Sequence, residues 1–179
     1  MADNRPPLPH DHLPDAPPLK VTSDDVSHGD TVPHACLADI MGMTGDNQSP
    51  HLRWEGAPAE TQSFAVTCYD PDAPTGSGFW HWVVFDIPAD VNELPRGAGS
   101  GSKEGLPKGA KQARNDAGEP GYVGPAPPPG HGDHRYVFTV HALSVPELGV
   151  DESATPAFVG FNLTFNTVAR GALVAEFGR

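Results

Sequence analysis

The sequence is poor in basic residues and has no long apolar run. Its 179 residues include 11 lysines and arginines against 23 aspartates and glutamates, which gives a formal net charge of −12. Nucleic acids and anionic membranes are bound mainly through clustered Lys and Arg, so neither is expected as a partner of the surface as a whole. A membrane-spanning helix needs roughly 18 apolar residues, and no segment reaches that length. An anion must therefore be bound at a local site, against the overall charge.

Cysteine is also scarce. Cys36 and Cys68 are the only two, and we expect reduced thiols in the core rather than a disulfide. The N-terminus lacks the basic region followed by an apolar region that marks a secretory signal. A cytoplasmic location without membrane insertion is the expectation that follows.

Glycine and proline, in contrast, are abundant, with 20 and 21 residues. Both residues break helices, so a mainly helical fold is disfavoured and short strands joined by turns are favoured. Residues 1–18 hold six of the prolines and almost no apolar pattern, which predicts a flexible arm that is mobile or loosely docked. The remaining residues, 19–179, are predicted to form a single domain.

Alternating apolar residues predict the positions of the strands. The expected strands are Leu19–Val26, Thr31–Leu37, His51–Trp54, Phe64–Tyr69, Phe79–Ile87 and Tyr136–Val145. Both faces of Phe79–Ile87 are largely apolar, so this strand should be central and covered on both sides. Residues 92–135 form a long Gly/Pro-rich loop, and its second half is expected to be functional.

The C-terminal end changes to a helical period. Thr155-Pro156 is typical of an N-cap followed by a first-turn proline. Apolar residues then recur three and four positions apart, which predicts an amphipathic helix that ends at Gly171. The residues on its apolar face are Phe158, Phe161, Phe165, Val168 and Ala172. The alternation after Gly171 predicts a last strand.

Polar residues stand at the ends of two strands. Asp70 follows Phe64–Tyr69 directly, and His81 lies on an otherwise apolar face of Phe79–Ile87. A buried histidine needs a hydrogen-bond partner, so we expect Asp70 to bind His81, fix its tautomer and raise its pKa. Asp72 is interpreted as a residue that caps the turn.

His131 and His134 lie three residues apart in a glycine-rich loop. His134 is expected to be a second donor to an anion, and His131 to be only exposed. A metal site shared with Asp70 and His81 is the weaker alternative, because the usual ligand spacings are missing. Backbone N–H groups of Gly121, Gly124, Gly130 and Gly132 are expected to complete an anion-binding concavity. Pro127 and Pro128 would add a rigid apolar wall.

Several of these segments, in this order and spacing, resemble the phosphatidylethanolamine-binding protein family, specifically its bacterial Raf-kinase-inhibitor-like branch. The matching pieces are Ser49-Pro50 with Leu52 and Trp54, Asp70 through Pro74, Trp80-His81-Trp82-Val83-Val84, Gly124 through Gly132, and His134-Arg135-Tyr136. The resemblance implies a mainly β fold, a sandwich of two antiparallel sheets with a C-terminal helix. It also implies a small pocket that accepts phosphate, a phosphorylated head group or a carboxylate.

Carried onto this chain, the pocket positions of the family are Asp70, Pro74, His81, Gly124, Pro127, Pro128, His134 and Tyr136. Tyr122 is added from its place in the loop. Family members often carry Gly-His in the C-terminal helix, where this chain has Phe165-Asn166, so control of the pocket by the helix is not carried over.

The expected function is a binding protein for a small anion, with no catalytic residues, cofactor or metal. It would exist as a monomer or homodimer. The alternative is a protein-interaction module that inhibits a protease or kinase, with the pocket reading an anionic group of the partner. A hydrolase using Asp70 and His81 ranks last, because no G-x-S-x-G elbow or other activated nucleophile is present.

Overall fold

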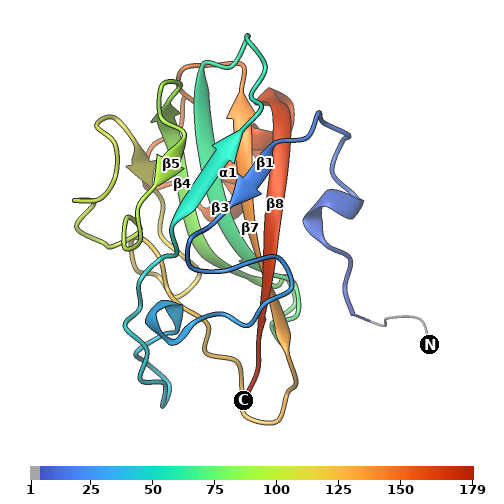
Figure 1. Cartoon of the computed structure of the whole chain (residues 1–179), viewed down its shortest axis with the longest axis vertical. Helices are drawn as coiled ribbons and strands as arrows, with labels where there is room; N and C mark the ends of the chain where they lie inside the picture. Colours follow the sequence, from blue (N-terminus) through green and yellow to red (C-terminus); the bar gives the residue numbers. More distant parts are fainter. Residues whose placement is uncertain (1–4) are drawn as a thin grey trace.

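The structure, a computed structural model, describes residues 5–179 as two antiparallel sheets packed face to face, with one α-helix near the C-terminus (Figure 1). The elements are η1 (Pro9–Asp11), β1 (Lys20–Thr22), η2 (His34–Cys36), β2 (Leu52–Glu55), β3 (Ser63–Asp70), β4 (Phe79–Pro88), β5 (Glu93–Leu94), β6 (Lys111–Gln112), β7 (His134–Leu143), α1 (Pro156–Asn166) and β8 (Thr167–Phe177). The predicted sandwich with a C-terminal helix is confirmed. None of the described helices is long and apolar enough to cross a membrane.

The larger sheet has the order β6-β4-β3-β7-β8 and the smaller one the order β1-β2-β5. Alternate residues of β3 define the two faces of the larger sheet. The inner face, which carries Phe64, Val66 and Cys68, packs with the smaller sheet in the main core. The outer face carries Ala65, which lies in a second apolar cluster with side chains of α1. Both faces of β4 are buried, as its sequence predicts.

Two features of the predicted helix are wrong. The N-cap at Thr155 is confirmed, because its hydroxyl accepts the Phe158 N–H at 3.2 Å. The buried face, however, carries Val159 and Leu163, whereas Phe158, Phe161 and Phe165 are 51%, 59% and 72% exposed. Helix α1 has no charged residue on any side, so its sequence does not distinguish the face that packs on the sheet. The helix also ends at Asn166, and Gly171 lies inside β8.

The predicted strand at Thr31–Leu37 is replaced by η2 and irregular chain. Pro33 has no N–H to donate to a sheet, and Val32 and Cys36 fill the core from a non-strand backbone. Both cysteines are buried free thiols, as expected.

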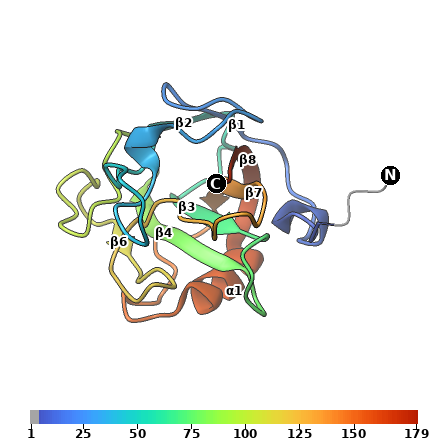
Figure 2. The same cartoon turned by 90° about the horizontal axis from the view of Figure 1, so that it is seen from below.

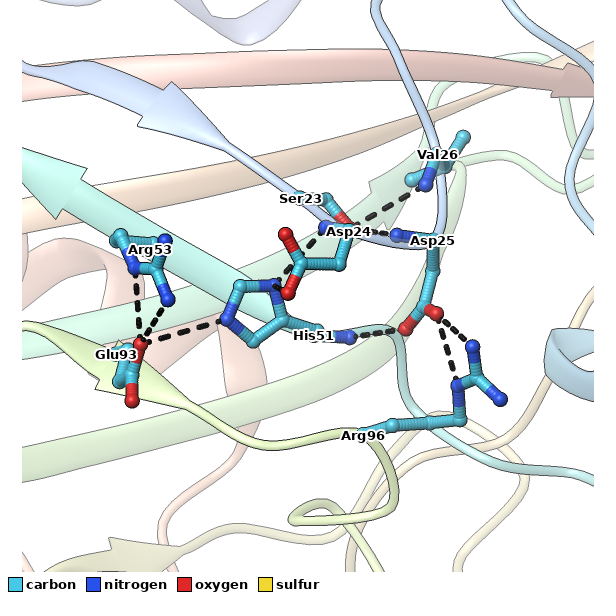
Figure 3. Close-up of polar contacts among 8 residues, drawn as sticks. All are labelled: Ser23, Asp24, Asp25, Val26, His51, Arg53, Glu93 and Arg96. Carbon is cyan, nitrogen blue, oxygen red and sulfur yellow. Dashed lines mark hydrogen bonds and ion pairs between the residues drawn. The ribbon is translucent and has the colours of Figure 1, made fainter.

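Strand β1 is shorter than predicted because the chain turns at Ser23, whose hydroxyl accepts the Asp25 and Val26 N–H groups. Figure 3 shows how this turn is tied to its neighbours. Asp25 accepts the His51 N–H at 2.7 Å and pairs with Arg96. The contacts hold the small sheet and its loops together.

The described part of the Pro-rich arm, residues 5–18, runs beside β8 (Figure 1). Residues 1–4 of the predicted arm lie outside the described residues. Arg135 donates to the Pro6 carbonyl at 2.6 Å, and Arg170 donates to the Pro14 carbonyl at 3.0 Å. The arm therefore contacts the domain through both of its ends.

Candidate functional site

A cavity of about 280 Å³ opens where β3 ends and β4 and β7 begin. We call it the strand-end cavity. β3 pairs antiparallel with β4 on one side and with β7 on the other. The end of β3 therefore lies beside the starts of both neighbours, which brings Asp70, His81 and His134 together at one end of these strands. Eight of the nine predicted binding residues line it, and Tyr122 is the exception. The lining residues are Ile40, Met41, Asp70, Ala73, Pro74, Thr75, Phe79, His81, Ala117, Val123, Gly124, Ala126, Pro127, Pro128, His134 and Tyr136.

Asp70 binds His134 and not His81, which corrects the predicted pair. The Asp70 Oδ2 atom lies 2.7 Å from His134 Nδ1, and Asp70 Oδ1 accepts the Asp72 N–H at 2.8 Å. Burial raises the pKa of Asp70 above its ordinary value, and the hydrogen bond from His134 opposes that rise. A carboxylate can only accept, so the proton of a neutral His134 ring is on Nδ1.

The imidazole of His81 is held by the loop that crosses the cavity. Its Nδ1 lies 2.7 Å from the Val123 carbonyl oxygen, which can only accept, so Nδ1 carries the proton. Complete burial lowers the pKa of His81 from 6.5 to about 4, whereas the sequence predicted a raised value. Near neutral pH the ring is therefore uncharged, and its Nε2 is an acceptor. Within residues 5–179 no hydrogen bond is made by this Nε2.

His131 contributes a contact that the sequence did not predict. Its Nδ1 lies 2.8 Å from Nε2 of His134, although His131 itself is exposed, as expected. Because Nδ1 of His134 donates to Asp70, its Nε2 accepts the proton of His131 in the neutral pair. The spacing of three residues between two glycines was the available sequence signal for this contact.

Tyr136 supplies an uncharged donor. Its ring stacks on His134 at a centroid distance of 6.5 Å and lies 5.2 Å from the His81 ring. Burial raises the pKa of Tyr136, so its hydroxyl keeps its proton. No described residue forms a hydrogen bond with this hydroxyl, which is therefore free to bind a ligand.

Tyr122 is a core residue and not a lining residue. Its hydroxyl donates to the Cys36 carbonyl at 2.7 Å, and its ring packs against Trp82 at a centroid distance of 6.0 Å. The side chain anchors the loop that lines the cavity instead of reaching the cavity itself.

The predicted cradle of glycine N–H groups is corrected for Gly121, Gly124 and Gly130, because these three N–H groups donate within the protein. Gly124 donates to Asn47 Oδ1 at 2.7 Å, and Gly130 donates to the Arg179 carbonyl at 2.7 Å. Gly124 is needed for close approach, because an added Cβ would clash with the backbone at Ala38. In the run 125–129 the one non-proline residue is Ala126, and its N–H has no partner in the described chain.

The mouth of the strand-end cavity combines apolar and cationic groups. Ile40 and Met41 are exposed there. Arg179 donates to the Pro127 carbonyl at 2.6 Å and to the Met41 carbonyl at 3.0 Å, which places a cation against two lining residues. No motif in the sequence pointed to Arg179.

The metal alternative finds no support in the described chain. No group of three or more His, Cys, Asp or Glu side chains in residues 5–179 is arranged to hold a metal ion. Here His131 contacts His134 directly, at hydrogen-bond distance, instead of sharing a central point with Asp70 and His81.

Comparisons of the sequence and of the structure with known proteins match the same family. The sequence model of the family described as "Phosphatidylethanolamine-binding protein" matches residues 22–178. The UPF0098 protein YbhB of Escherichia coli (strain K12) is 53% identical over 159 residues, which cover 89% of this chain and 99% of the relative. E. coli YbcL, whose crystal structure is described as that of a new member of the mammalian PEBP family, shares 43% sequence identity with this chain. The two structures superpose with a TM-score of 0.88. The match covers 90% of this chain and 98% of that chain.

A more distant structure agrees with this result. A phosphatidylethanolamine-binding protein homologue from Chlamydia trachomatis is 27% identical with a TM-score of 0.75, and the match covers 92% of this chain and 99% of that chain.

Proposed function

The chain belongs to the phosphatidylethanolamine-binding protein family, and we propose that its strand-end cavity binds the phosphoryl or carboxylate group of a small molecule. One observation carries the proposal. His81 Nε2 and the Tyr136 hydroxyl belong to buried side chains that line the cavity, and neither has a partner in residues 5–179. Buried polar groups are nearly always hydrogen-bonded, so a ligand or water must complete these two.

Binding of the anion requires a proton, which is carried either by the anion or by His81. The neutral His81 ring offers a lone pair, which repels a bare anion and accepts from a protonated one. A phosphate monoanion can donate its hydroxyl to Nε2 while one of its oxygens accepts from Tyr136. A ligand without a proton requires protonation of His81. By either route, affinity increases as the pH falls.

The rest of the cavity favours a head group attached to an apolar part. Ile40, Met41, Phe79 and Pro128 surround the polar residues with apolar surface. Arg179 adds a positive charge close to the mouth, on a molecule whose overall charge is −12. We propose that the head group contacts His81 and Tyr136 while an apolar substituent lies against the rim.

The affinity for a bare anion should be modest. Hydrogen bonds to a charged ligand contribute about 1.5–3 kcal/mol each. Association costs at least about 4 kcal/mol in lost translational and rotational freedom. Four bonds at the upper value would leave about 8 kcal/mol, a micromolar dissociation constant for inorganic phosphate, and three at the same value about 5 kcal/mol, which is sub-millimolar.

The proposal is of a binding protein rather than an enzyme. Asp70, the side chain best placed to act as a base, already accepts hydrogen bonds from His134 and from the Asp72 N–H. Turnover of a panel of phosphoesters that is abolished by Asp70→Asn would contradict this part of the proposal.

The test is calorimetric titration with inorganic phosphate and sulfate between pH 5 and 8. Sulfate does not titrate in this range, so the dependence of its affinity on pH reports the protein alone. We expect its affinity to rise by up to tenfold for each unit of decrease in pH. A flat profile for sulfate would contradict proton uptake at His81.

Two tyrosine variants test whether phosphate binds in the strand-end cavity. Tyr136→Phe removes the proposed donor and should weaken phosphate binding by about fivefold or more. Tyr122→Phe removes a hydroxyl bound to Cys36 and should leave phosphate affinity unchanged. Equal affinities in the two variants would place the anion elsewhere.

A second candidate role, protein interaction, is favoured by the exposed stripe of Phe158, Phe161 and Phe165 on α1. The first partner to test is a second copy of this chain. Helix α1 carries no charged side chain, so a contact between two copies through this helix places none of its own side chains against a like charge. Sedimentation analysis should show self-association that Phe161→Asp removes. A wild-type protein that stays monomeric at high concentration would contradict this role for the stripe.

A further inference from the structure

A second and larger cavity, of about 930 Å³, lies on the outer face of the larger sheet. Its walls are the Pro-rich arm on one side and α1 on the other, and we call it the arm cavity. Figure 2 shows the arm beside β8 and α1 beneath the sheet, on the side away from β1 and β2. The volume is in the range of sites that hold a drug-sized molecule.

The floor of the arm cavity carries three polar side chains. Thr67 of β3 faces its register partner Thr139 of β7, and His141 follows two residues later on the same face. They are only 4%, 6% and 6% exposed, and all three line the cavity. Within residues 5–179 neither threonine hydroxyl forms a hydrogen bond. Both hydroxyls lie on side chains that line the cavity, so they are available to a molecule bound there.

The hydrogen bonds of His141 fix what that molecule must offer. The Thr167 hydroxyl donates its one proton to the Leu163 carbonyl at 2.7 Å, so it can only accept from His141 Nδ1, at 3.1 Å. Nδ1 therefore carries the ring proton, and Nε2 is an acceptor with no partner in the described chain. Burial lowers the pKa of His141 to about 3, so the ring stays neutral under ordinary conditions.

The Pro-rich arm, residues 5–18, forms the roof of the arm cavity and is fixed to the domain. The backbone N–H of Arg170 donates to the Pro17 carbonyl at 2.9 Å, and its guanidinium donates to the Pro14 carbonyl at 3.0 Å. Gly171 allows this approach, because an added Cβ would clash with the Leu19 carbonyl. Prolines carry no N–H, so they form an apolar wall that leaves few donors unpaired. The family model matches residues 22–178, so the arm, residues 5–18, lies outside the matched segment.

We propose that the arm cavity is a second binding site, separate from the strand-end cavity, for an uncharged and mainly apolar molecule whose hydroxyl donates to Nε2 of His141. The two threonine hydroxyls bind its remaining polar atoms. An anion is disfavoured, because the floor offers a lone pair and hydroxyls, the guanidinium of the lining residue Arg170 donates to the arm, and the carboxylates of Asp15 and Asp116 also line the cavity.

The test uses three probes of one shape, 2-naphthol, 2-methoxynaphthalene and 2-naphthoate, in two-dimensional NMR titrations of the full chain. We expect 2-naphthol to shift the amide signals of β7 and β8 and to bind about fivefold more tightly than 2-methoxynaphthalene, which has no proton to donate. The anion 2-naphthoate should not bind in the arm cavity.

Three variants complete the test. His141→Phe removes Nε2 but keeps a ring, so the preference for 2-naphthol should disappear while the dispersed spectrum shows a folded chain. Ala172→Phe fills the arm cavity and should abolish binding of both neutral probes. His81→Phe, a matched change in the strand-end cavity, should still bind 2-naphthol more tightly than 2-methoxynaphthalene.

Three results would overturn the proposal. They are equal affinities of the two neutral probes for the wild-type protein, a preference that survives His141→Phe, and signal shifts confined to the strand-end cavity. Absence of binding by 2-naphthol up to its solubility would overturn it as well.

Discussion

The Asp72 carboxylate accepts three hydrogen bonds from Arg135. The backbone N–H and Nε of Arg135 donate to Oδ2 at 2.9 and 2.8 Å, and Nη2 donates to Oδ1 at 2.7 Å. This buried pair joins the turn after β3 to the first residues of β7 and so holds Asp70 next to His134. The same Nη2 donates to the Pro6 carbonyl, which links the strand-end cavity to the arm. Asp72, interpreted from sequence as a turn cap, is thus the partner of Arg135.

Asp72→Ala should lower the free energy of unfolding by about 3 kcal/mol, because it leaves the Arg135 guanidinium buried without its partner. Denaturant unfolding measures the change. The control is Glu93→Ala, which removes an exposed ion pair with Arg53 at 2.8 Å and should have little effect. Similar losses in the two variants would show that the Asp72 pair is not buried in solution.

Stability should fall as the pH decreases from neutral toward 4. The unfolded chain protonates His81 near pH 6.5, whereas the folded protein does so only near 4, so acid favours the unfolded state between these values. Lowering the pH from 7 to 5 should remove about 2 kcal/mol through this one residue. Thermal unfolding of His81→Phe over the same range should show a smaller loss. Parallel curves for the two proteins would argue against a neutral His81.

His131→Ala should strengthen phosphate binding by about fivefold. In the free protein His131 Nδ1 contacts Nε2 of His134 at 2.8 Å. Nε2 of the neutral His134 ring is an acceptor, so it donates to an anion only when it carries a proton and is released from His131. Calorimetry at pH 6 measures the change, with His12→Ala, in the arm, as the control histidine. Weaker binding by His131→Ala would instead make His131 a ligand contact.

Gly124→Ala should destabilise the protein by about 2 kcal/mol, because the added Cβ would clash with the backbone at Ala38 and Cys36. The control is Gly76→Ala, since a Cβ on Gly76 meets no atom within 4 Å. Thermal melts compare the two. Equal melting temperatures would contradict the close approach of these segments.

The packing of α1 is tested by two substitutions on the same helix. Leu163→Ala should cost at least about 2 kcal/mol, because Leu163 is 2% exposed and packs on the sheet. Phe161→Ala should change stability by no more than about 0.5 kcal/mol, because Phe161 is 59% exposed. The reverse order would show that the phenylalanine stripe faces the core, as its spacing first suggested.

The sequence located the elements that form the strand-end cavity. Alternation identified β3, β4 and β7, since a strand with a buried face repeats every two residues. The resemblance of short motifs then placed eight lining residues, among them Asp70, His81 and His134. These features are local or nearly local, and so they can be read from one chain without coordinates.

The partners of those residues depended on tertiary structure. Asp70 and His134 are separated by 64 positions, and only the pairing of β3 with β7 brings them to 2.7 Å. The pKa of His81 moved opposite to expectation, because burial and a carbonyl partner replaced the expected carboxylate. The sequence of the uncharged α1 does not tell its two faces apart, and only the structure shows that Val159 and Leu163 pack on the sheet.

By itself, the sequence determined β3, β4 and β7, the cap of the helix and the residue types that line the strand-end cavity, because each follows from local patterns along the chain. Tertiary structure alone decided which donor meets which acceptor, and it created the arm cavity. The roof and floor of that cavity come from segments at opposite ends of the chain, and no periodicity connects them.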